Sequence, residues 1–206
     1  MKKSSIVIVA LIALASGFLL SWHLASNKLI KLEAGSWYGN QSRALPEFEL
    51  VDHRGNKLTN ENLRGKWSLM FFGYTRCPDI CPTTLQDMSS MVKAIDDPDV
   101  SDAINIYFVS VDPERDTPEV LASYVPYFNA NFIGATASME KLKVLTNSLG
   151  IAHDISNKSE GSRGYDVSHS AAIVLINPQV EFSGLFGAPH DAMAMALDMT
   201  RIVEYN

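Results

Sequence analysis

The sequence predicts a mixed α/β domain, and three observations carry that prediction. Apolar runs of strand length alternate with segments of helical periodicity, one such run leads straight into a loop with both cysteines, and a final pair of strands precedes one more helix. A chain of 206 residues can hold one such domain with a substantial core and a short accessory segment.

The composition is that of a folded protein whose partners are not nucleic acids. Apolar residues make up 47% of the chain and charged residues 19%, which excludes an intrinsically disordered protein. The formal net charge is -6 and no stripe of Lys and Arg is present, so we expect no nucleic-acid partner. The two cysteines lie close together, whereas a disulfide framework would need more cysteines spread through the chain.

The amino-terminal residues have the pattern of a membrane anchor. Lys2 and Lys3 are followed by an uncharged run that lasts until Lys28 and is mostly Ile, Val, Ala and Leu. A run of this length can cross the hydrocarbon layer as one helix, and the preceding positive charges keep its start in the cytoplasm. We therefore expect residues 1–27 to be a single-pass transmembrane anchor in the inner membrane.

The rest of the chain is then expected to be exported, with the soluble domain in the periplasm or an equivalent compartment. A cleaved signal segment shares the basic start and the apolar core, and it is the alternative for residues 1–27. Residues 28–45 contain Lys, Ser, Gly and Asn with a few apolar residues, and we expect them to be a linker. Residues 46–206 are expected to be the folded domain.

The first half of the domain is predicted to begin with a hairpin. Residues 47–51 start with polar–apolar alternation, which is typical of a half-buried strand, and turn residues follow at 52–56. Residues 68–73 are an apolar run, as in a strand covered on both faces. After the cysteine loop, apolar residues at helical spacing predict a helix over residues 82–95.

The second half alternates in the same way. Residues 104–111 are a predicted strand, and Thr117 is the predicted N-cap of a helix that begins with the proline after it. A short extended piece at 132–134 precedes a helix over 139–149, which ends at the glycine that follows.

The last part of the chain closes the domain. Residues 171–176 and 180–186 are predicted strands on either side of a turn, and residues 191–203 are a predicted helix. The whole order, β–loop–α–β–α and later ββα, is similar to that of a thioredoxin-like domain. In this order the cysteine loop lies at the carboxyl end of a central strand, the edge where the ligand sites of open α/β sheets gather.

Cys77 and Cys81 lie four positions apart at the start of the helix that follows this strand. One helical turn puts both sulfurs on one face. The positive end of the helix and Arg76 favour thiolates, which bind soft metals and attack disulfides. Disulfide exchange usually uses two intervening residues, whereas the three found here let both sulfurs face one ion more easily. The sequence is therefore compatible with two uses of Cys77 and Cys81, which are copper binding and a redox-active disulfide.

His169 is the candidate third ligand. It lies directly before the predicted strand 171–176, and in a thioredoxin-like fold the segment before that strand packs beside the cysteine loop. Thioredoxins have a proline there, which offers a metal no ligand. Two thiolates and one imidazole suit one copper ion per chain, as Cu(I) or Cu(II), whereas Zn(II) would need a fourth ligand.

Five charged residues near the predicted site are expected to tune the ligands or to dock a partner. They are Arg76, Asp79, Asp112, Asp116 and Asp166. The first two belong to the cysteine loop, and the last precedes the candidate histidine. Asp112 and Asp116 follow a predicted strand that ends at the same edge of the sheet. The start of the next helix explains most of the sequence pattern around them.

Three motifs together resemble the Sco/SenC family of copper chaperones. They are Gly-Tyr-Thr-Arg-Cys-Pro-Asp-Ile-Cys-Pro-Thr at 73–83, Ser-Val-Asp-Pro-Glu-Arg-Asp-Thr-Pro at 110–118 and His-Ser-Ala-Ala at 169–172. They occur in the family's order, and the resemblance covers roughly residues 46–206. The chain departs from the family at Ser168, because many members have an Asp directly before the histidine.

The resemblance implies a thioredoxin-like domain on a single membrane anchor, with copper held by Cys77, Cys81 and His169. It implies delivery of that copper to the dinuclear copper centre of cytochrome c oxidase, so the implied partner is the copper-accepting subunit of the oxidase. Other copper chaperones and thioredoxin-like reductants are further partners that it implies.

Two other functions would use the same cysteines. A thiol–disulfide oxidoreductase would use a Cys77–Cys81 disulfide to reduce the cysteines of an apo-oxidase subunit or of another exported protein. A peroxidase would share the fold, but it would leave His169 without a role. We therefore expect a metallochaperone rather than an enzyme, with the oxidoreductase as the alternative.

Overall fold

The computed structural model describes residues 8, 11–18, 31–151, 153–156 and 166–205, with the backbone alone for 40, 153–156 and 166–169. The chain divides into two compact units, Met1–Lys31 and Leu32–Asn206. In the first unit, residues 11–18 are helical. Among the described residues, no helix combines the length and the apolar character that a membrane span requires.

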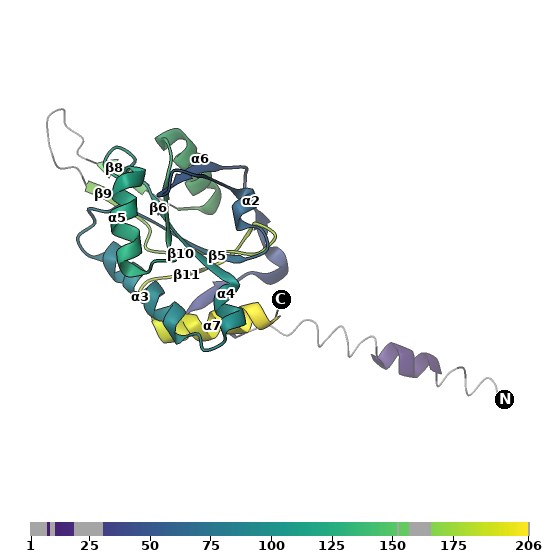
Figure 1. Cartoon of the computed structure of the whole chain (residues 1–206). Helices are drawn as coiled ribbons and strands as arrows, with labels where there is room; N and C mark the ends of the chain where they lie inside the picture. Colours follow the sequence, from purple (N-terminus) through teal and green to yellow (C-terminus); the bar gives the residue numbers. More distant parts are fainter. Residues whose placement is uncertain (1–7, 9–10, 19–30, 152, 157–165, 206) are drawn as a thin grey trace. The chain divides into compact units, whose positions relative to one another are not determined.

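A mixed sheet forms the centre of the second unit (Figure 1). In the described part of the chain its nine strands are β1 (Gly35–Trp37), β2 (Arg43–Ala44), β3 (Glu49–Asp52), β4 (Lys57–Thr59), β5 (Trp67–Gly73), β6 (Ile104–Ser110), β7 (Ile133–Thr136), β10 (Ile173–Ile176) and β11 (Glu181–Phe186). The order across the sheet is β1-β11-β10-β5-β6-β7-β3-β4, with β2 beside β11. The strands β5, β6 and β7 run parallel, and the other pairs are antiparallel.

Helices cover this sheet on both sides. They are α2 (Asn60–Leu63), α3 (Ile80–Ala94), α4 (Pro98–Asp102), α5 (Pro118–Phe128), α6 (Met139–Leu149) and α7 (Ala192–Tyr205), with a 3-10 turn η1 (Gly39–Gln41). In Figure 1 the central strands run between α6 above them and α3 and α7 below them. The helix α3 packs against both α5 and α7, so the helix that follows the cysteine loop is held from two directions.

The position of β5 and β6 in the sheet explains why they are continuous apolar runs. Every residue of β5 is buried, and so are the last five residues of β6. Each strand has a neighbour on either side and helices over both faces, so neither face meets water. The parallel register pairs Gly73 with Ser110, which brings the two segments that follow these strands to one edge of the sheet.

The element order expected for a thioredoxin-like domain is confirmed. The series β5, loop, α3, β6, α5 is followed later in the chain by β10, β11 and α7. The predicted hairpin near residues 47–56 is also present, because β3 pairs with β4 in antiparallel register.

The stretch expected to be a linker contributes two strands to the sheet, because β1 and β2 both pair with β11. The backbone N–H groups of Glu33, Ala34 and Gly35 donate to the carboxylate of Asp198 at 2.8–3.0 Å. Asp198 is fully buried on α7, and a buried carboxylate requires such donors. Asp198 therefore holds the start of the domain against its last helix.

A separate two-stranded sheet is formed by β8 (His153–Ser156) and β9 (Asp166–His169). The two strands are antiparallel, and their register places His153 directly opposite His169. Because β9 ends only four residues before β10 begins, this small sheet leads straight into the main sheet.

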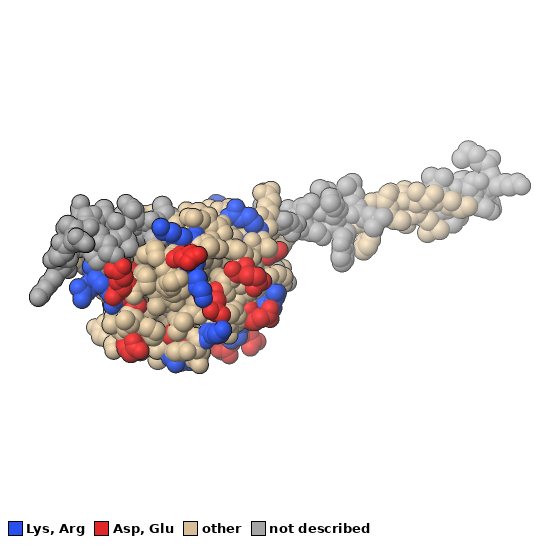
Figure 2. Space-filling view, turned by 90° about the horizontal axis from the view of Figure 1, so that it is seen from above, with Lys and Arg blue, Asp and Glu red and all other residues tan. Residues whose placement is uncertain are grey.

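Charges of both signs are mixed on the surface. On the face shown in Figure 2, Lys and Arg lie interspersed with Asp and Glu rather than in a patch of one sign. The exposed carboxylate of Glu49, for example, pairs with Lys57 at 3.0 Å and with Lys141 at 2.8 Å. Exposed pairs of this kind are screened by water and contribute little, so the buried core is the main source of stability.

Candidate metal centre

The cysteine loop begins where β5 ends, and the geometry there requires Gly73. A Cβ atom on Gly73 would lie 2.7 Å from Cys81 Sγ and 2.9 Å from the ring of Phe108. Both distances are well below an ordinary van der Waals contact. The absence of a side chain therefore lets the Cys81 sulfur pack directly against the strand. The N–H of Val111 donates to the Gly73 carbonyl at 2.9 Å and ties this point to the end of β6.

Cys77 and Cys81 lie on either side of the first residue of α3. Cys77 precedes the helix and is 8% exposed, whereas Cys81 is the second helical residue and is fully buried. Neither cysteine is in a disulfide, and the backbone N–H of Cys81 donates to Cys77 Sγ at 3.4 Å. The first N–H groups of a helix have no partner within the helix, and the helix dipole favours negative charge at this end. The start of α3 is thus suited to hold a sulfur that carries negative charge.

The two sulfurs differ in their surroundings. Burial raises the pKa of the Cys81 thiol above its ordinary range, because the apolar interior disfavours the thiolate. Cys81 is therefore a neutral thiol in the metal-free protein at neutral pH. A metal that takes this sulfur as a ligand must displace its proton.

Asp116 fixes the cysteine loop from inside the protein. Its fully buried carboxylate accepts hydrogen bonds from the Thr75 N–H at 2.8 Å and from the Thr75 hydroxyl at 2.6 Å. The Ser110 hydroxyl donates to the same carboxylate at 2.6 Å. Hydrogen bonds to a charged acceptor are stronger than neutral ones. Because Thr75 lies two residues before Cys77, Asp116 sets the position of the first cysteine.

Asp112 supports the loop in a second way. It is also fully buried, and its carboxylate pairs with Nε of Arg115. The guanidinium of Arg115 lies 5.7 Å from the centre of the Tyr74 ring, at a distance that suits a cation–π contact. Tyr74 directly follows β5, so Asp112 and Arg115 hold the first turn of the loop.

The other three charged residues of the predicted site lie on the cysteine loop or on β9. Arg76 and Asp79 are exposed on the cysteine loop. Asp79 precedes α3, but its side chain makes no capping hydrogen bond; its carbonyl oxygen accepts from the hydroxyl of Thr83 at 2.9 Å. Asp166 begins β9, where the structure describes the backbone alone. Of the four charged residues whose side chains the structure describes, Asp112 and Asp116 make the side-chain bonds given above.

The backbone brings His169 to the same edge of the sheet as the cysteines. His169 ends β9, and β10 begins four residues later at Ile173, which pairs with Phe71 near the end of β5. The Nε2 atom of His190 lies 2.9 Å from the carbonyl oxygen of Ala171, so a side chain near the last helix contacts the segment between the two strands. The side chain of His169 lies outside the described residues, and its role as a ligand stays a prediction.

The described donors fit a soft metal ion. Among the side chains that the structure describes, no group of three His, Cys, Asp or Glu residues could hold a metal ion. Cys77 and Cys81 supply two sulfur donors from one helix start, and two thiolates are sufficient for Cu(I). The chemistry of these donors therefore fits copper, and a third ligand would come from beyond the described side chains.

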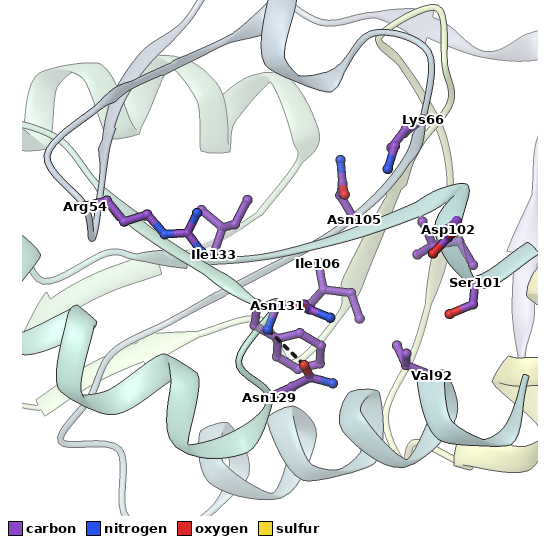
Figure 3. Close-up of a pocket in the computed structure, with 12 residues that line it drawn as sticks. Arg54, Lys66, Val92, Ser101, Asp102, Asn105, Ile106, Asn129, Asn131 and Ile133 are labelled. Atoms are coloured by element: carbon purple, nitrogen blue, oxygen red, sulfur yellow. Dashed lines mark hydrogen bonds between the residues drawn. The ribbon is translucent and has the colours of Figure 1, made fainter. Parts of the chain in front are cut away.

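A separate cavity lies at the other end of the central strands (Figure 3). Its volume is about 340 Å³, and its lining includes Lys66, Ile104 and Asn105, at the amino-terminal ends of β5 and β6. The cysteine loop follows the carboxyl end of β5. The cavity is therefore not part of the candidate metal centre.

Three residues that shape the site had no role in the prediction from sequence. Gly73 makes room for a sulfur, and Thr75 and Ser110 donate to the carboxylate that fixes the loop. All three lie inside the motifs at 73–83 and 110–118, so their presence in those motifs was the sequence feature that could have pointed to a role in the site. Their roles depend on contacts between two segments that only the fold brings together.

Comparison with known proteins places this geometry in a family. The SCO1/SenC family model matches residues 38–204. A relative from Stutzerimonas stutzeri is 38% identical over 149 residues, which are 72% of each chain. Protein sco1 of Schizosaccharomyces pombe is 36% identical over 141 residues, which are 68% of this chain and 53% of the yeast protein. The chain thus spans about half the length of that yeast relative.

Solved structures with a similar fold include two with copper bound. Arabidopsis thaliana ScoI with copper bound has a TM-score of 0.71 and 30% identity, over 79% of this chain and 99% of that chain. Bradyrhizobium japonicum ScoI with copper bound has a TM-score of 0.68 and 31% identity, over 77% of this chain and 98% of that chain. The resemblance seen in the three motifs is confirmed, and this chain belongs to the SCO1/SenC family.

Proposed function

We propose that this chain binds one copper ion and passes it to the copper-accepting subunit of cytochrome c oxidase, for the dinuclear copper centre. The observation that carries the proposal is the pair of cysteines at the start of α3, with the backbone of His169 at the same edge of the sheet. Copper-bound structures of ScoI from two organisms support copper as the metal.

In this proposal the ligands are Cys77, Cys81 and His169. Two thiolates suit Cu(I), and the imidazole adds a donor that Cu(II) accepts as well. Because Cys77 is 8% exposed and Cys81 is fully buried, the first cysteine is the ligand that an acceptor can reach. Transfer then begins when a ligand of the acceptor replaces Cys77, while Cys81 keeps the ion inside until the exchange is complete.

We further propose that residues 1–27 anchor the chain in the inner membrane with the domain in the periplasm. The uncharged run between Lys3 and Lys28 supports this placement, because it is long enough to cross a bilayer and is preceded by positive charge. An anchor would keep the domain close to a membrane-bound acceptor. Membrane fractionation of the full chain tests it, since a cleaved signal segment would release the domain as a soluble protein.

The experiment that tests the copper function compares His169→Ala with wild type. Copper affinity of the reduced chain should fall, while reduction of a model disulfide by the two cysteines survives. His153→Ala is the matched control, because His153 lies directly opposite His169 in the register of β8 and β9. A His169→Ala chain that binds copper as tightly as wild type would contradict the three-ligand site.

A thiol–disulfide oxidoreductase is the second candidate. Neither cysteine is in a disulfide, and the Cys77 sulfur accepts a hydrogen bond from the backbone N–H of Cys81 at 3.4 Å. The Cys77 thiolate would attack a target disulfide and release one target thiolate, and Cys81 would then resolve the mixed disulfide. The target gains two electrons, and the pair ends as a disulfide. A strongly oxidising reduction potential of this pair would argue against a reductase.

A further inference from the structure

A hydrogen bond joins the side chain of His190 to the backbone between β9 and β10. The Nε2 atom of His190 lies 2.9 Å from the carbonyl oxygen of Ala171. A carbonyl oxygen can only accept a hydrogen bond, so Nε2 carries the proton, and Nδ1 of the neutral ring has the lone pair. The contact with Ala171 therefore sets the tautomer of this histidine.

The other ring nitrogen of His190 has no partner. Its Nδ1 atom is buried and makes no hydrogen bond in the described part of the chain. A buried acceptor without a donor has lost its hydrogen bonds to water, and native proteins keep few such groups. A phenylalanine would fill a similar space without this loss, so packing alone does not explain a histidine here. What the histidine adds is the N–H group that Ala171 accepts.

The carbonyl that accepts this hydrogen bond belongs to the segment 170–172, which joins β9 to β10. The strand β9 ends at His169, and the pairing of β10 with its neighbours begins at Ile173. The N–H of Ala172 donates to the hydroxyl of Ser170 at 3.2 Å, but that bond lies within the segment. The bond from His190, in contrast, ties the segment 170–172 to the chain between β11 and α7.

Three parts of the chain meet at this edge of the sheet. Ile173 pairs with Phe71 near the end of β5, and it also pairs with Phe186 at the end of β11. The cysteine loop follows β5, the segment 170–172 precedes β10, and the loop with His190 follows β11. The register of the three strands therefore brings His190 and the backbone of His169 to the edge where the cysteines lie.

The position of His190 is itself well defined. The next residue, Asp191, accepts hydrogen bonds from the backbone N–H groups of Met193 and Ala194, both at 3.0 Å. These are bonds of an N-cap, so they fix the chain at the start of α7. The helix α7 packs against α3, which begins at the cysteines. His190 thus links the segment after His169 to a helix that is packed against the cysteine helix.

We propose that His190 is a positioning residue of the metal centre and holds the segment 170–172 so that His169 reaches the ion bound by the two cysteines. This inference rests on the proposed copper function. Ligands from separate segments bind one ion tightly only when their supports hold them in place. Loss of the hydrogen bond from His190 would leave Cys77 and Cys81 where they are and would remove the contribution of the third ligand.

The variant His190→Phe keeps a ring of similar size and removes the N–H group. The full-length reduced chain is titrated with Cu(I) against a chromophoric Cu(I) chelator, and amide hydrogen exchange is measured on the metal-free chain. We expect Cu(I) affinity about tenfold weaker than that of wild type, and faster exchange in the segment 170–172. His190→Ala should give the same two changes without added volume, so overpacking by phenylalanine would not be their cause. His190→Gln should restore part of both, because its amide N–H can donate to the same carbonyl.

His53→Phe is the matched control. The Nδ1 atom of His53 accepts a hydrogen bond from the N–H of Gly134 at 2.8 Å, so this histidine also contacts the backbone through one ring nitrogen. It lies in the turn between β3 and β4, which are the last two strands on the opposite side of the sheet from β11. We expect wild-type Cu(I) affinity in His53→Phe and unchanged exchange in the segment 170–172.

A double variant tests whether His190 acts through His169. Once His169 is replaced by Ala, the further change His190→Phe should not weaken Cu(I) binding any more, because the ligand that His190 positions is gone. An additional loss in the double variant overturns the inference, since His190 would then act by another route. Wild-type affinity or unchanged exchange in His190→Phe also overturns it, and the proposed function stands as long as His169→Ala still weakens binding. A His169→Ala chain with wild-type affinity, or a folded wild-type chain that binds no copper, overturns the three-ligand site together with this inference.

Discussion

Replacing Gly73 by Ala would put a methyl group into the space that Cys81 Sγ and the Phe108 ring occupy. The new Cβ atom would start 2.7 Å from the sulfur and 2.9 Å from the ring. Ordinary contacts between such atoms are about 3.5–4.0 Å, so the sulfur and the ring must each retreat by about 1 Å. Both side chains are fully buried, so neither can move without disturbing its neighbours.

The expected cost follows from this overpacking. An extra methyl group in a well-packed core destabilises a protein by about 1–3 kcal/mol. In a domain of this size each kcal/mol lowers the unfolding midpoint by roughly 2–4 °C, so the metal-free Gly73→Ala chain should unfold roughly 2–12 °C below wild type. Because a proposed ligand sulfur is displaced, Cu(I) affinity should also fall by about tenfold or more.

Thermal unfolding of the metal-free chain and a Cu(I) competition titration measure the two effects. Gly187→Ala is the matched control, because a Cβ atom there would meet no atom within 4 Å and the backbone φ of Gly187 is not positive. We expect the control to behave as wild type in both assays. A Gly73→Ala chain as stable and as tight-binding as the control would refute the packing of the Cys81 sulfur against β5.

Three further predictions follow from the contacts described above. Asp116→Ala should lower the free energy of unfolding by about 3 kcal/mol, because three donors lose their buried acceptor, whereas Ser110→Ala should cost only about 1 kcal/mol. Denaturant titrations measure both, and equal losses would speak against the network. Burial lowers the pKa of His53, whose Nδ1 accepts from the Gly134 N–H at 2.8 Å, so only the unfolded chain takes up this proton as the pH falls below 6.5. The free energy of unfolding should therefore decrease as the pH falls from 6.5 to the pKa that His53 has in the folded chain. The decrease should be less steep in His53→Gln, and an unchanged slope would assign the effect to another group. Burial also raises the pKa of Cys81, so copper affinity of the reduced chain should increase by at least about one log unit per pH unit between about pH 6 and 8. A pH-independent affinity would rule out Cys81 as a ligand that loses its proton on binding.

The central part of the fold could be predicted because burial on both faces leaves a clear pattern. The runs that became β5 and β6 are apolar throughout, and the cysteine loop between β5 and α3 is marked by its own motif. The parallel register then brings the ends of both strands to one edge. Predicting the two strands was therefore enough to predict that the motifs at 73–83 and 110–118 lie together.

The strands β1 and β2 could not be predicted, because they have only three and two residues and show no alternation that a pattern could detect. Their start is held by Asp198, which lies more than 160 residues later in the chain. The sequence shows an aspartate within an apolar helical pattern, but it does not show which backbone N–H groups donate hydrogen bonds to it.

The roles of the acidic residues could be located but not distinguished. Asp79, Asp112 and Asp116 all lie in the expected loops, yet the first is exposed and the other two are fully buried. Burial depends on which neighbours close over a side chain, and Thr75 and Ser110 come from two different segments.

The copper content of the reduced full-length chain, after free metal has been removed, tests the central claim most directly. The account predicts one copper ion per wild-type chain, with thiolate-to-Cu(II) charge-transfer bands when Cu(II) is supplied. It also predicts that the double variant Cys77→Ser, Cys81→Ser folds but retains no copper. A folded and fully reduced wild-type chain without bound copper would contradict the account and would favour the oxidoreductase.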